Sequence, residues 1–226
     1  NDFADRHLDG GVARTRGRPL VVGTVSEREA LLLFSALLVL AFMLVLLTNR
    51  LTVMLSVAAV LLASTYPFMK RFTHMPQFVL GAAFSWSIPM AFAAQRGALP
   101  PALWLLYAGN LLWTMAYDTK YAMVDREDDL KIGIKSSAIL FGRHDRLIVG
   151  GLQAGCLLCL YLAGQAFALG LVYQLSLAAA AALFVYQQHL IRARDPQDCF
   201  RAFLHNNWVG MTVFAGIALH YSIGGR

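Results

Sequence analysis

The stretch that decides the fold is ALLLFSALLVLAFMLVLL, residues 30–47, which carries no charged side chain. A helix needs about 20 predominantly apolar residues to cross the hydrocarbon core of a bilayer. The run also lacks the alternation of polar and apolar residues that marks a membrane β-strand. It therefore predicts a transmembrane α-helix.

Further apolar blocks of similar length follow along the chain, separated by short polar turns. The composition agrees, because 58% of the 226 residues are hydrophobic and only 14% are charged, where a soluble domain has about 25% charged residues. We predict an all-α fold, a polytopic transmembrane helical bundle. Its seven visible spans are Ala30–Leu47, Leu51–Phe68, Gln77–Ala94, Ala102–Tyr117, Leu147–Ala163, Leu169–Tyr186 and Phe203–Tyr221.

The basic residues alternate between the segments that these spans separate. When the segments are numbered along the chain, the odd ones contain 16 of the 19 Lys and Arg residues and all 13 acidic residues. The positive-inside rule places such segments in the cytoplasm. The net charge of +6 thus follows from topology, and no nucleic-acid-binding motif accompanies it. The alternation also predicts that residues 1–18 and 118–135 lie on the same face of the membrane.

These two segments each carry a cluster of carboxylates. The first reads Asn1-Asp2-Phe3-Ala4-Asp5-Arg6-His7-Leu8-Asp9, and the second runs from Asp118 to Asp129. If each cluster continues a helix, Asp5 and Asp9 share one helical face, and Asp125 and Asp129 share another. Like charges at that spacing repel, and a hard divalent cation such as Mg²⁺ relieves the repulsion. Because Mg²⁺ also binds substrate phosphates, the pair of clusters predicts a diphosphate site rather than two solvated helix ends.

Several motifs, in order along nearly the whole chain, resemble those of the UbiA superfamily of membrane prenyltransferases. They are Asn1–Asp9, Arg14-Thr15, Arg18-Pro19-Leu20, Tyr66–Arg71, Tyr117–Ala122, Asp125–Asp129 and Lys131–Ser137. The resemblance implies nine helices around a central cavity. The chain begins at Asn1 without an initiator Met, so we expect an amino-terminal portion of about two helices to precede it. Residues 1–226 would then form a single membrane-embedded prenyltransferase domain.

The resemblance also implies the activity. A polyprenyl group would pass from polyprenyl diphosphate to the ring of an aromatic acid, 4-hydroxybenzoate, ortho to its hydroxyl, as in ubiquinone biosynthesis. The lipid bilayer is then the third partner, and the bacterial inner membrane, with a cytoplasmic active site, is favoured over the mitochondrial one. The length of the prenyl chain depends on the shape of an apolar tunnel that the sequence does not reveal.

By the same resemblance, individual residues acquire expected roles. The metal ligands for Mg²⁺ would be Asn1, Asp2, Asp5, Asp9, Asp125, Asp128 and Asp129. The residues that bind the diphosphate or the acceptor would be Asn1, Arg14, Arg18, Tyr66, Lys70, Arg71, Asp118, Lys131 and Lys135. The catalytic residues would be Asp5, Asp9, Asp125, Asp129 and Arg71. Either Asp125 or Asp118 would accept the proton that the ring releases.

Polar and aromatic residues inside the spans have two readings. Asn110, Thr114 and Asp118 form a polar stripe on one helix, and His205, Asn206 and Asn207 lie near the start of the last span. Polar groups at membrane depth face either a cavity or a partner helix. Aromatic side chains such as Trp113 would stabilise a cation or simply pack in the core.

A CDP-alcohol phosphotransferase is the nearest alternative. The run Asp9-Gly10-Gly11-Val12-Ala13-Arg14 matches that family's D-G-x-x-A-R, and Gly23 follows at its spacing. The match fails where the second pair of aspartates should stand, because Glu27 and Leu31 occupy those positions. Nor would that family explain Asp118–Asp129. A UbiA-type enzyme with another aromatic acceptor remains open. A transporter predicts charged residues in the middle of its spans, and none is found in the central part of any span.

Overall fold

The computed structural model describes residues 2–7, 9–12 and 14–223, and within these ranges the chain is helical with no strand. The longer helices are α3 (Glu27–Leu46), α4 (Arg50–Thr65), α6 (Pro76–Ser85), α7 (Ser87–Arg96), α8 (Leu103–Val124), α11 (Asp145–Ala166), α12 (Leu171–Leu190), α13 (Pro196–Leu204) and α14 (Asn206–Ile223). The short helices are α1 (Asp2–Asp5), α2 (Pro19–Val22), α5 (Met69–Phe72), α9 (Arg126–Ile132) and α10 (Ser137–Phe141). Four 3₁₀ turns join them at Asp9–Gly11, Tyr66–Phe68, Gly142–His144 and Ile191–Ala193.

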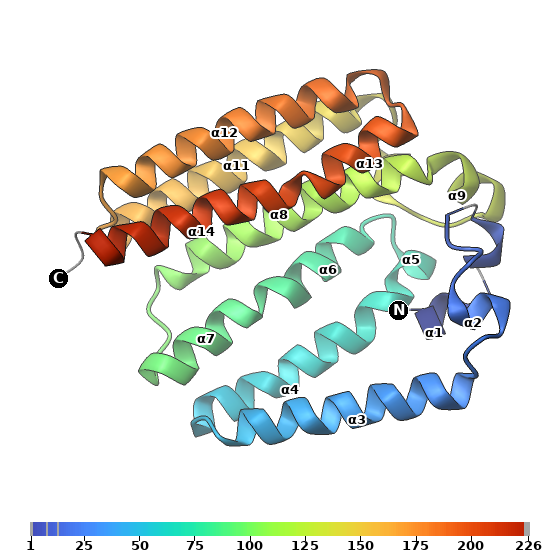
Figure 1. Ribbon diagram of the computed structural model, residues 1–226, viewed down its shortest axis with the longest axis horizontal. Helices are drawn as coiled ribbons and strands as arrows, with labels where there is room; N and C mark the ends of the chain where they lie inside the picture. The colour runs from blue at the N-terminus through green and yellow to red at the C-terminus, as the bar shows by residue number, and fades with distance from the viewer. Residues whose placement is uncertain (1, 8, 13, 224–226) are drawn as a thin grey trace.

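The predicted all-α membrane bundle is confirmed. Helix α8 lies between the two halves of the molecule and packs against α6 on one side and against α11 and α13 on the other. Helices α11, α12 and α14 complete one half, and α3 with α4 forms the far edge of the other (Figure 1). Among the described residues, four stretches are long and apolar enough to cross a membrane, namely Glu27–Leu46, Arg50–Phe72, Pro76–Arg96 and Ser137–Ala166. Crossing by α8, α12 and α14 remains a prediction.

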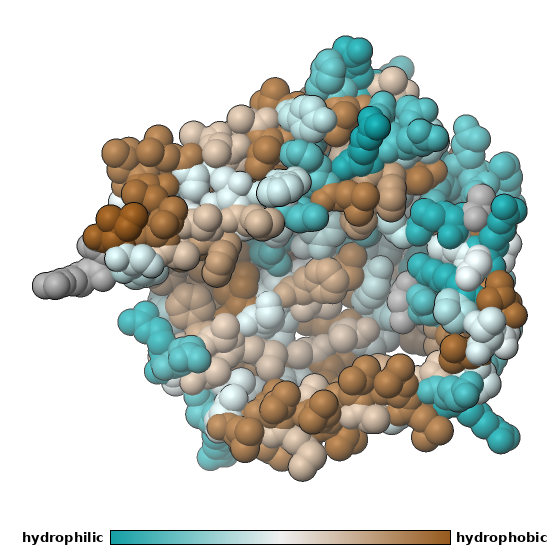
Figure 2. Space-filling model, viewed as in Figure 1, coloured by the Kyte–Doolittle hydropathy of each residue, from teal (hydrophilic) through white to brown (hydrophobic). Residues whose placement is uncertain are grey.

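The surface of α3 is what a lipid-facing helix requires. None of its residues is buried, and Leu32 is 71% exposed. Apolar residues cover this helix along the lower edge of the molecule, while hydrophilic residues gather at the end where α1, α2 and α9 lie (Figure 2). Such a continuous apolar surface is unfavourable in water and costs nothing in hydrocarbon. The helix begins at a capping box, in which Ser26 and Glu29 bond each other's backbone N–H.

Two breaks in the long helices shape the hydrophilic end. At Pro67, which has no N–H to donate, α4 gives way to the 3₁₀ turn Tyr66–Phe68 and then to α5. At Asp125, which has φ −95° and ψ 3°, α8 gives way to α9. Gly133, in the left-handed region at φ 74°, ends α9. These breaks bring two polar segments to the same end of the bundle.

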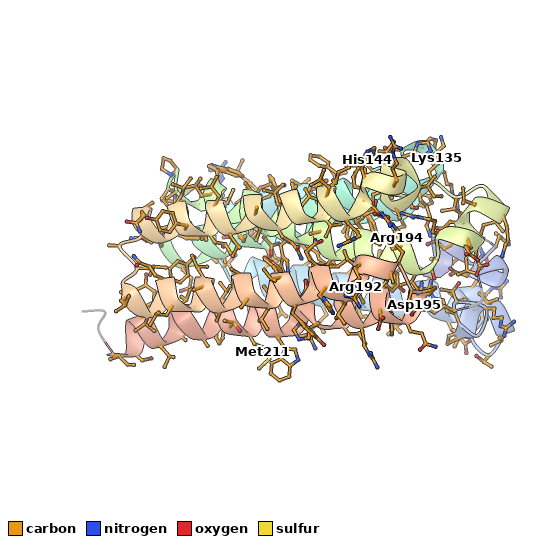
Figure 3. All side chains as sticks on the ribbon, turned by 90° about the horizontal axis from the view of Figure 1, so that it is seen from above. Lys135, His144, Arg192, Arg194, Asp195 and Met211 are labelled. Atoms are coloured by element: carbon orange, nitrogen blue, oxygen red, sulfur yellow. The ribbon has the colours of Figure 1, made fainter. Side chains whose placement is uncertain are left out.

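The side chains of other odd-numbered segments lie toward the same end. Lys135, His144, Arg192, Arg194 and Asp195 cluster there, whereas Met211 lies along α14 (Figure 3). The predicted convergence of charged segments, far apart in sequence, is thus confirmed for the described residues.

Candidate functional site

A charged cavity of about 120 Å³ lies at the hydrophilic end, between the amino-terminal segment, the α4–α5 junction, α6 and the α8–α9 junction. Nine of the predicted site residues line it: Asp9, Arg14, Arg18, Tyr66, Lys70, Asp118, Asp125, Asp129 and Lys135. Acidic residues from both predicted clusters therefore face one space. They do so together with four basic residues, so the cavity is mixed in charge.

The other predicted site residues lie around the charged cavity rather than in its wall. Asp2, Asp5, Arg71, Asp128 and Lys131 are not among the residues that line it. Two of them are held to its wall by direct contacts. Asp5 forms an ion pair with Lys70, and Asp2 forms one with Arg18. Asn1 lies outside the described residues.

The first cluster departs from the predicted geometry. Helix α1 ends at Asp5, and a 3₁₀ turn begins at Asp9, so the two side chains do not share one helical face. The condition of a continuous helix is therefore not met in the first cluster, and Gly10 and Gly11 favour the turn that begins at Asp9. The hydroxyl of Thr15 also donates a hydrogen bond to the carbonyl of Asp9 at 2.8 Å, which folds the segment back on itself.

Each carboxylate of the first cluster is nonetheless held close to a cation. The Arg18 guanidinium lies 2.8 Å from an oxygen of Asp9 and 3.0 Å from one of Asp2. Lys70 Nζ lies 2.6 Å from Asp5 Oδ2. A further contact ties α5 to this segment, because Arg71 donates a hydrogen bond of 2.5 Å to the carbonyl of Ala4.

Asp5 is the most deeply buried of these acids. It is 0% exposed, and neither of its carboxylate oxygens has a hydrogen bond of acceptable geometry. The contact with Lys70 is an ion pair by distance alone. A buried carboxylate normally accepts hydrogen bonds or binds a metal, because desolvation of the charge is otherwise expensive. With no hydrogen bond to either oxygen and Lys70 as its ion-pair partner, Asp5 can serve as a ligand for a metal cation.

The second cluster keeps the predicted spacing. The N–H of Asp129 bonds the carbonyl of Asp125 at 2.9 Å, so the two residues are one helical turn apart. Arg14 binds both carboxylate oxygens of Asp125, at 3.2 and 2.5 Å, and its guanidinium stacks on the Tyr121 ring, 4.2 Å from the centroid. Asp128 pairs with Lys131 at 3.1 Å.

The protonation of Asp129 differs from that of an exposed aspartate. Burial, followed by the negative charge of Asp125, raises the pKa of Asp129 to about 6, although the positive charges of Lys70 and Arg14 oppose the shift. The side chain is almost fully buried. A further positive charge close to Asp129, such as a metal ion, would favour the ionised form of its carboxyl group.

The donor chemistry of the site suits Mg²⁺. Among the described residues, no three His, Cys, Asp or Glu side chains lie close enough together to hold one ion. Mg²⁺ does not need such a cage, since it commonly takes one or two carboxylates and completes its shell with water and substrate phosphates. The oxygens of Asp5, which accept no hydrogen bond, and the buried carboxylate of Asp129 supply hard ligands of this kind.

Sequence reasoning missed several residues of the cavity wall. They are Val12, Thr15, Pro67, Pro76, Gln77, Tyr121, Ala122, Ile134 and Ser136. Gln77 and Asp118 face the same cavity. Tyr121 had a usable signal, because it follows Asp118 by three residues and so lies on the same face of α8. Gln77 had none, since it reaches the cavity only through the packing of α6 on α8.

A bundle of apolar helices with an acidic, cation-rich cavity at its polar end fits a membrane enzyme for a phosphorylated substrate. The family comparison makes this specific, because residues 1–211 match the model of the UbiA prenyltransferase family. The chain belongs to this family. It is a membrane prenyltransferase by class, and the phosphotransferase alternative is set aside.

Curated relatives are similar over almost the whole chain. The 4-hydroxybenzoate octaprenyltransferase of Saccharophagus degradans is 62% identical over 217 residues, which cover 96% of this chain and 73% of the relative. The protein of that name from Pseudomonas aeruginosa is 61% identical over 223 residues, covering 99% and 75%.

Solved structures share the fold. The apo structure of a UbiA homolog from Aeropyrum pernix K1 superposes with a TM-score of 0.85 at 27% identity, covering 96% of this chain and 82% of that one. A UbiA homolog from Archaeoglobus fulgidus, bound to GPP and Mg²⁺, gives a TM-score of 0.70 at 19% identity, covering 96% and 81%. At that identity the second likeness speaks for the fold alone.

Proposed function

We propose that this protein transfers a polyprenyl group from polyprenyl diphosphate to the ring carbon of 4-hydroxybenzoate beside the hydroxyl, a step of ubiquinone biosynthesis. The observation that carries the proposal is the meeting of both acidic clusters and four basic residues around one cavity. The names of relatives about 60% identical support the choice of acceptor.

The basic residues of the cavity bind the diphosphate. Arg14 and Arg18 each hold a carboxylate through a guanidinium group that binds phosphate oxygens equally well. Lys70 and Lys135 belong to neighbouring segments, because the N–H of Lys135 bonds the carbonyl of Lys70 at 3.4 Å. Exchange of a carboxylate partner for a phosphate oxygen would release Asp9 and Asp125 to act as ligands.

The carboxylates that would hold Mg²⁺ are Asp2, Asp5, Asp9, Asp125, Asp128 and Asp129. When bound, the ion supplies positive charge that stabilises the leaving diphosphate. The chain's own contribution is to bring ligands from two distant segments to one place. The contact between Arg14 and Asp125 joins those segments directly.

The transfer breaks the bond between the prenyl carbon and the diphosphate oxygen, and forms a bond from that carbon to the ring. The ring proton passes to a carboxylate. Asp118 suits this role better than Asp125, because Arg14 occupies both oxygens of Asp125, whereas Asp118 forms no ion pair with any of the described residues. We expect Asp118→Asn to lower kcat while the KM for prenyl diphosphate stays unchanged. If kcat and the KM for prenyl diphosphate change by the same factor, Asp118 binds the donor instead.

We place the protein in the bacterial inner membrane with the charged cavity on the cytoplasmic side. The charge alternation supports this orientation, since the segments at the cavity end contain most of the Lys and Arg residues. The relatives named above come from bacteria, which supports the choice of the bacterial inner membrane.

An acceptor panel in membranes tests the proposed function. Membranes with the protein are supplied with a radiolabelled prenyl diphosphate, with 4-hydroxybenzoate, homogentisate or a naphthoate, and with Mg²⁺ or a chelator. We expect label on 4-hydroxybenzoate only when Mg²⁺ is present. Preferential labelling of another acceptor would show that 4-hydroxybenzoate is not the substrate. Transfer in the presence of the chelator would show that the reaction does not require Mg²⁺.

A further inference from the structure

A second charged cluster lies at the hydrophilic end of the bundle, where Figure 3 shows Arg194. It consists of Arg126, the first residue of α9, Asp145, the first residue of α11, and Arg194, the residue after the 3₁₀ turn Ile191–Ala193. These three residues are not among those that line the charged cavity. The cluster joins three segments that are far apart in the sequence, and the proposed transfer does not use it.

Asp145 accepts hydrogen bonds at both of its carboxylate oxygens. Arg126 Nη2 lies 2.5 Å from Oδ2, and Arg194 Nη2 lies 2.8 Å from Oδ1. Arg194 Nε lies 3.1 Å from each oxygen, and the N–H of Arg146 donates to Oδ1 at 2.6 Å. The residue is 0% exposed. A buried carboxylate is expensive to leave unpaired, and charge-assisted bonds of this kind are strong. Asp145 therefore fixes the positions of both guanidinium groups.

Arg126 connects this cluster to the second group of acidic residues. It follows Asp125 directly, at the point where α8 gives way to α9. Its Nη2 also donates to the carbonyl of Ala138 in α10, at 2.7 Å. Helix α9 has only seven residues, and a helix of that length is not stable without tertiary contacts. The contacts of Arg126 therefore determine the direction of α9, and with it the position of the Asp129 carboxylate.

Arg194 holds Asp145 independently of α9. Its backbone has φ 58° and ψ 23°, in the left-handed region that residues other than glycine rarely adopt. Its Nη2 also donates to the carbonyl of Arg143 at 2.8 Å. Such a backbone conformation persists where the surrounding contacts maintain it. Because Arg194 and the N–H of Arg146 both bind Asp145, the carboxylate can restrain α9 rather than move with it.

We infer that Asp145 is a positioning residue that acts through Arg126 to keep Asp125 and Asp129 directed into the charged cavity for a divalent cation. The inference rests on the proposed function, in which both carboxylates serve Mg²⁺. Asp145 lies outside the charged cavity, so it acts on the ligands and not on the substrates. Replacement of residues that orient metal ligands typically lowers metal affinity or activity by about 10- to 100-fold.

Asp145→Asn tests the inference, because it removes the charge and keeps the shape of the side chain. In the purified complete protein with geranyl diphosphate, we expect Mn²⁺ affinity to fall about tenfold. The electron paramagnetic resonance signal of free Mn²⁺ measures this binding without catalysis, and a protein-free sample corrects for Mn²⁺ bound by the diphosphate. The Mg²⁺ concentration for half-maximal transfer should rise by a similar factor, while the KM for the acceptor stays unchanged. Asp198→Asn is the matched control, since Asp198 pairs with Arg201 at 3.2 Å on α13.

A second variant tests the route through Arg126. Arg126→Gln should weaken Mn²⁺ binding to the same extent as Asp145→Asn, and the double variant should show no further loss, because the two residues act in one chain of contacts. Additive losses would show that Asp145 does not act through Arg126. Unchanged Mn²⁺ affinity in Asp145→Asn, with only a lower Tm, would show a purely structural role. Either result overturns the inference.

If Asp145→Asn does not fold, Arg194→Gly takes its place. Glycine suits the left-handed φ, so the backbone of this variant is unstrained, yet Asp145 loses its second guanidinium. We expect Mn²⁺ affinity to fall in Arg194→Gly as well, by a smaller factor, and an unchanged affinity would overturn the inference. A wild-type protein that binds Mn²⁺ but transfers no prenyl group would refute the proposed function alone, because Mn²⁺ binding reports on Asp145 without any transfer.

Discussion

Several carboxylates can lie close together around the charged cavity because individual ones form ion pairs with basic residues. Arg18 accompanies Asp9, and Arg14 accompanies Asp125. Like charges in one partly buried place would otherwise force some of them to take up protons. Asp129 illustrates the effect, because no cation pairs with it among the described contacts and its pKa is raised. The balance of charge at this site is thus set by individual residue pairs.

The first residue-level prediction concerns the two clusters together. Asp5→Asn and Asp125→Asn each remove one negative charge with little change in shape. We expect each to slow Mg²⁺-dependent prenyl transfer by about a hundredfold or more, as the loss of other electrostatic stabilisers does. Because both residues act on one leaving group, the double variant should be far less impaired than the product of the single effects.

Steady-state transfer by the two single variants and the double variant, in matched membranes, measures this coupling. Asp198→Asn is the control, since Asp198 pairs with Arg201 on an exposed surface of α13. Full activity of Asp125→Asn would remove the second cluster from the mechanism.

The raised pKa of Asp129 predicts a pH dependence. With a folded-state pKa of about 6 and an unfolded value near 3.9, Asp129 stabilises the metal-free protein below about pH 4. That contribution is lost as the pH rises through 6. Mg²⁺ prefers the ionised form, so we expect the Mg²⁺ concentration for half-maximal activity to increase as the pH falls from 7.5 to 5.5. Activity titrations at both pH values check this, and Asp129→Asn should show a smaller change. A wild-type requirement that does not vary with pH would contradict it.

At the scale of elements, the apolar blocks were enough to predict the helices. Residues 30–47 correspond to α3, which begins three residues earlier at its capping box. Breaks within a predicted span were harder to predict. The predicted span Gln77–Ala94, for example, is divided at Trp86 into α6 and α7. Pro89 explains this break, because it has no N–H to bond the carbonyl of Ser85. A block of apolar residues hides such a kink when its composition is read alone.

The contacts between elements were the part that the sequence did not specify. Asn110 donates a hydrogen bond of 3.0 Å to Ser85 Oγ on α6, so the helix–helix reading of that residue is confirmed. Asn206 contacts Trp113 and Lys120, which precede it by more than 80 residues. No local periodicity indicates which distant side chain a buried amide will meet, since that depends on how whole helices pack.

The turn at Gly133 yields an element-level prediction. Gly133 ends α9 at φ 74°, and the N–H of Ile134 bonds the carbonyl of Asp129 at 3.0 Å. A side chain at that φ is strained by about 1 kcal/mol, and nothing lies within 4 Å of the added Cβ, so the backbone alone bears the effect. We expect Gly133→Ala to lower Tm and to raise the Mg²⁺ requirement, because α9 carries Asp129.

Thermal unfolding in detergent, with an Mg²⁺ titration of activity, measures both effects. Gly17→Ala is the control, because a Cβ there also meets no atom within 4 Å and its φ is not in the left-handed region. If the two variants unfold at the same temperature, the turn does not stabilise α9.

At the scale of the whole molecule, the alternation of charge along the sequence was enough to predict that the two acidic segments converge. It worked because the bilayer leaves only two faces on which loops can lie. The same rule makes a prediction about orientation. The side chain of Lys131, beside the charged cavity, is 69% exposed, and Arg96 is exposed at the carboxyl end of α7. These two positions should lie on opposite sides of the membrane.

Cysteine labelling decides the orientation. Cys156 and Cys199 are buried and Cys159 is half-buried in α11, so native thiols will contribute little background. In intact cells, an impermeant thiol reagent should label Arg96→Cys, whereas Lys131→Cys should react only after the membrane is permeabilised. The two variants are controls for each other, because each is labelled under one condition. Labelling of Lys131→Cys from outside would place the charged cavity on the outer face, and the proposed cytoplasmic site would then be wrong even if prenyl transfer itself were confirmed.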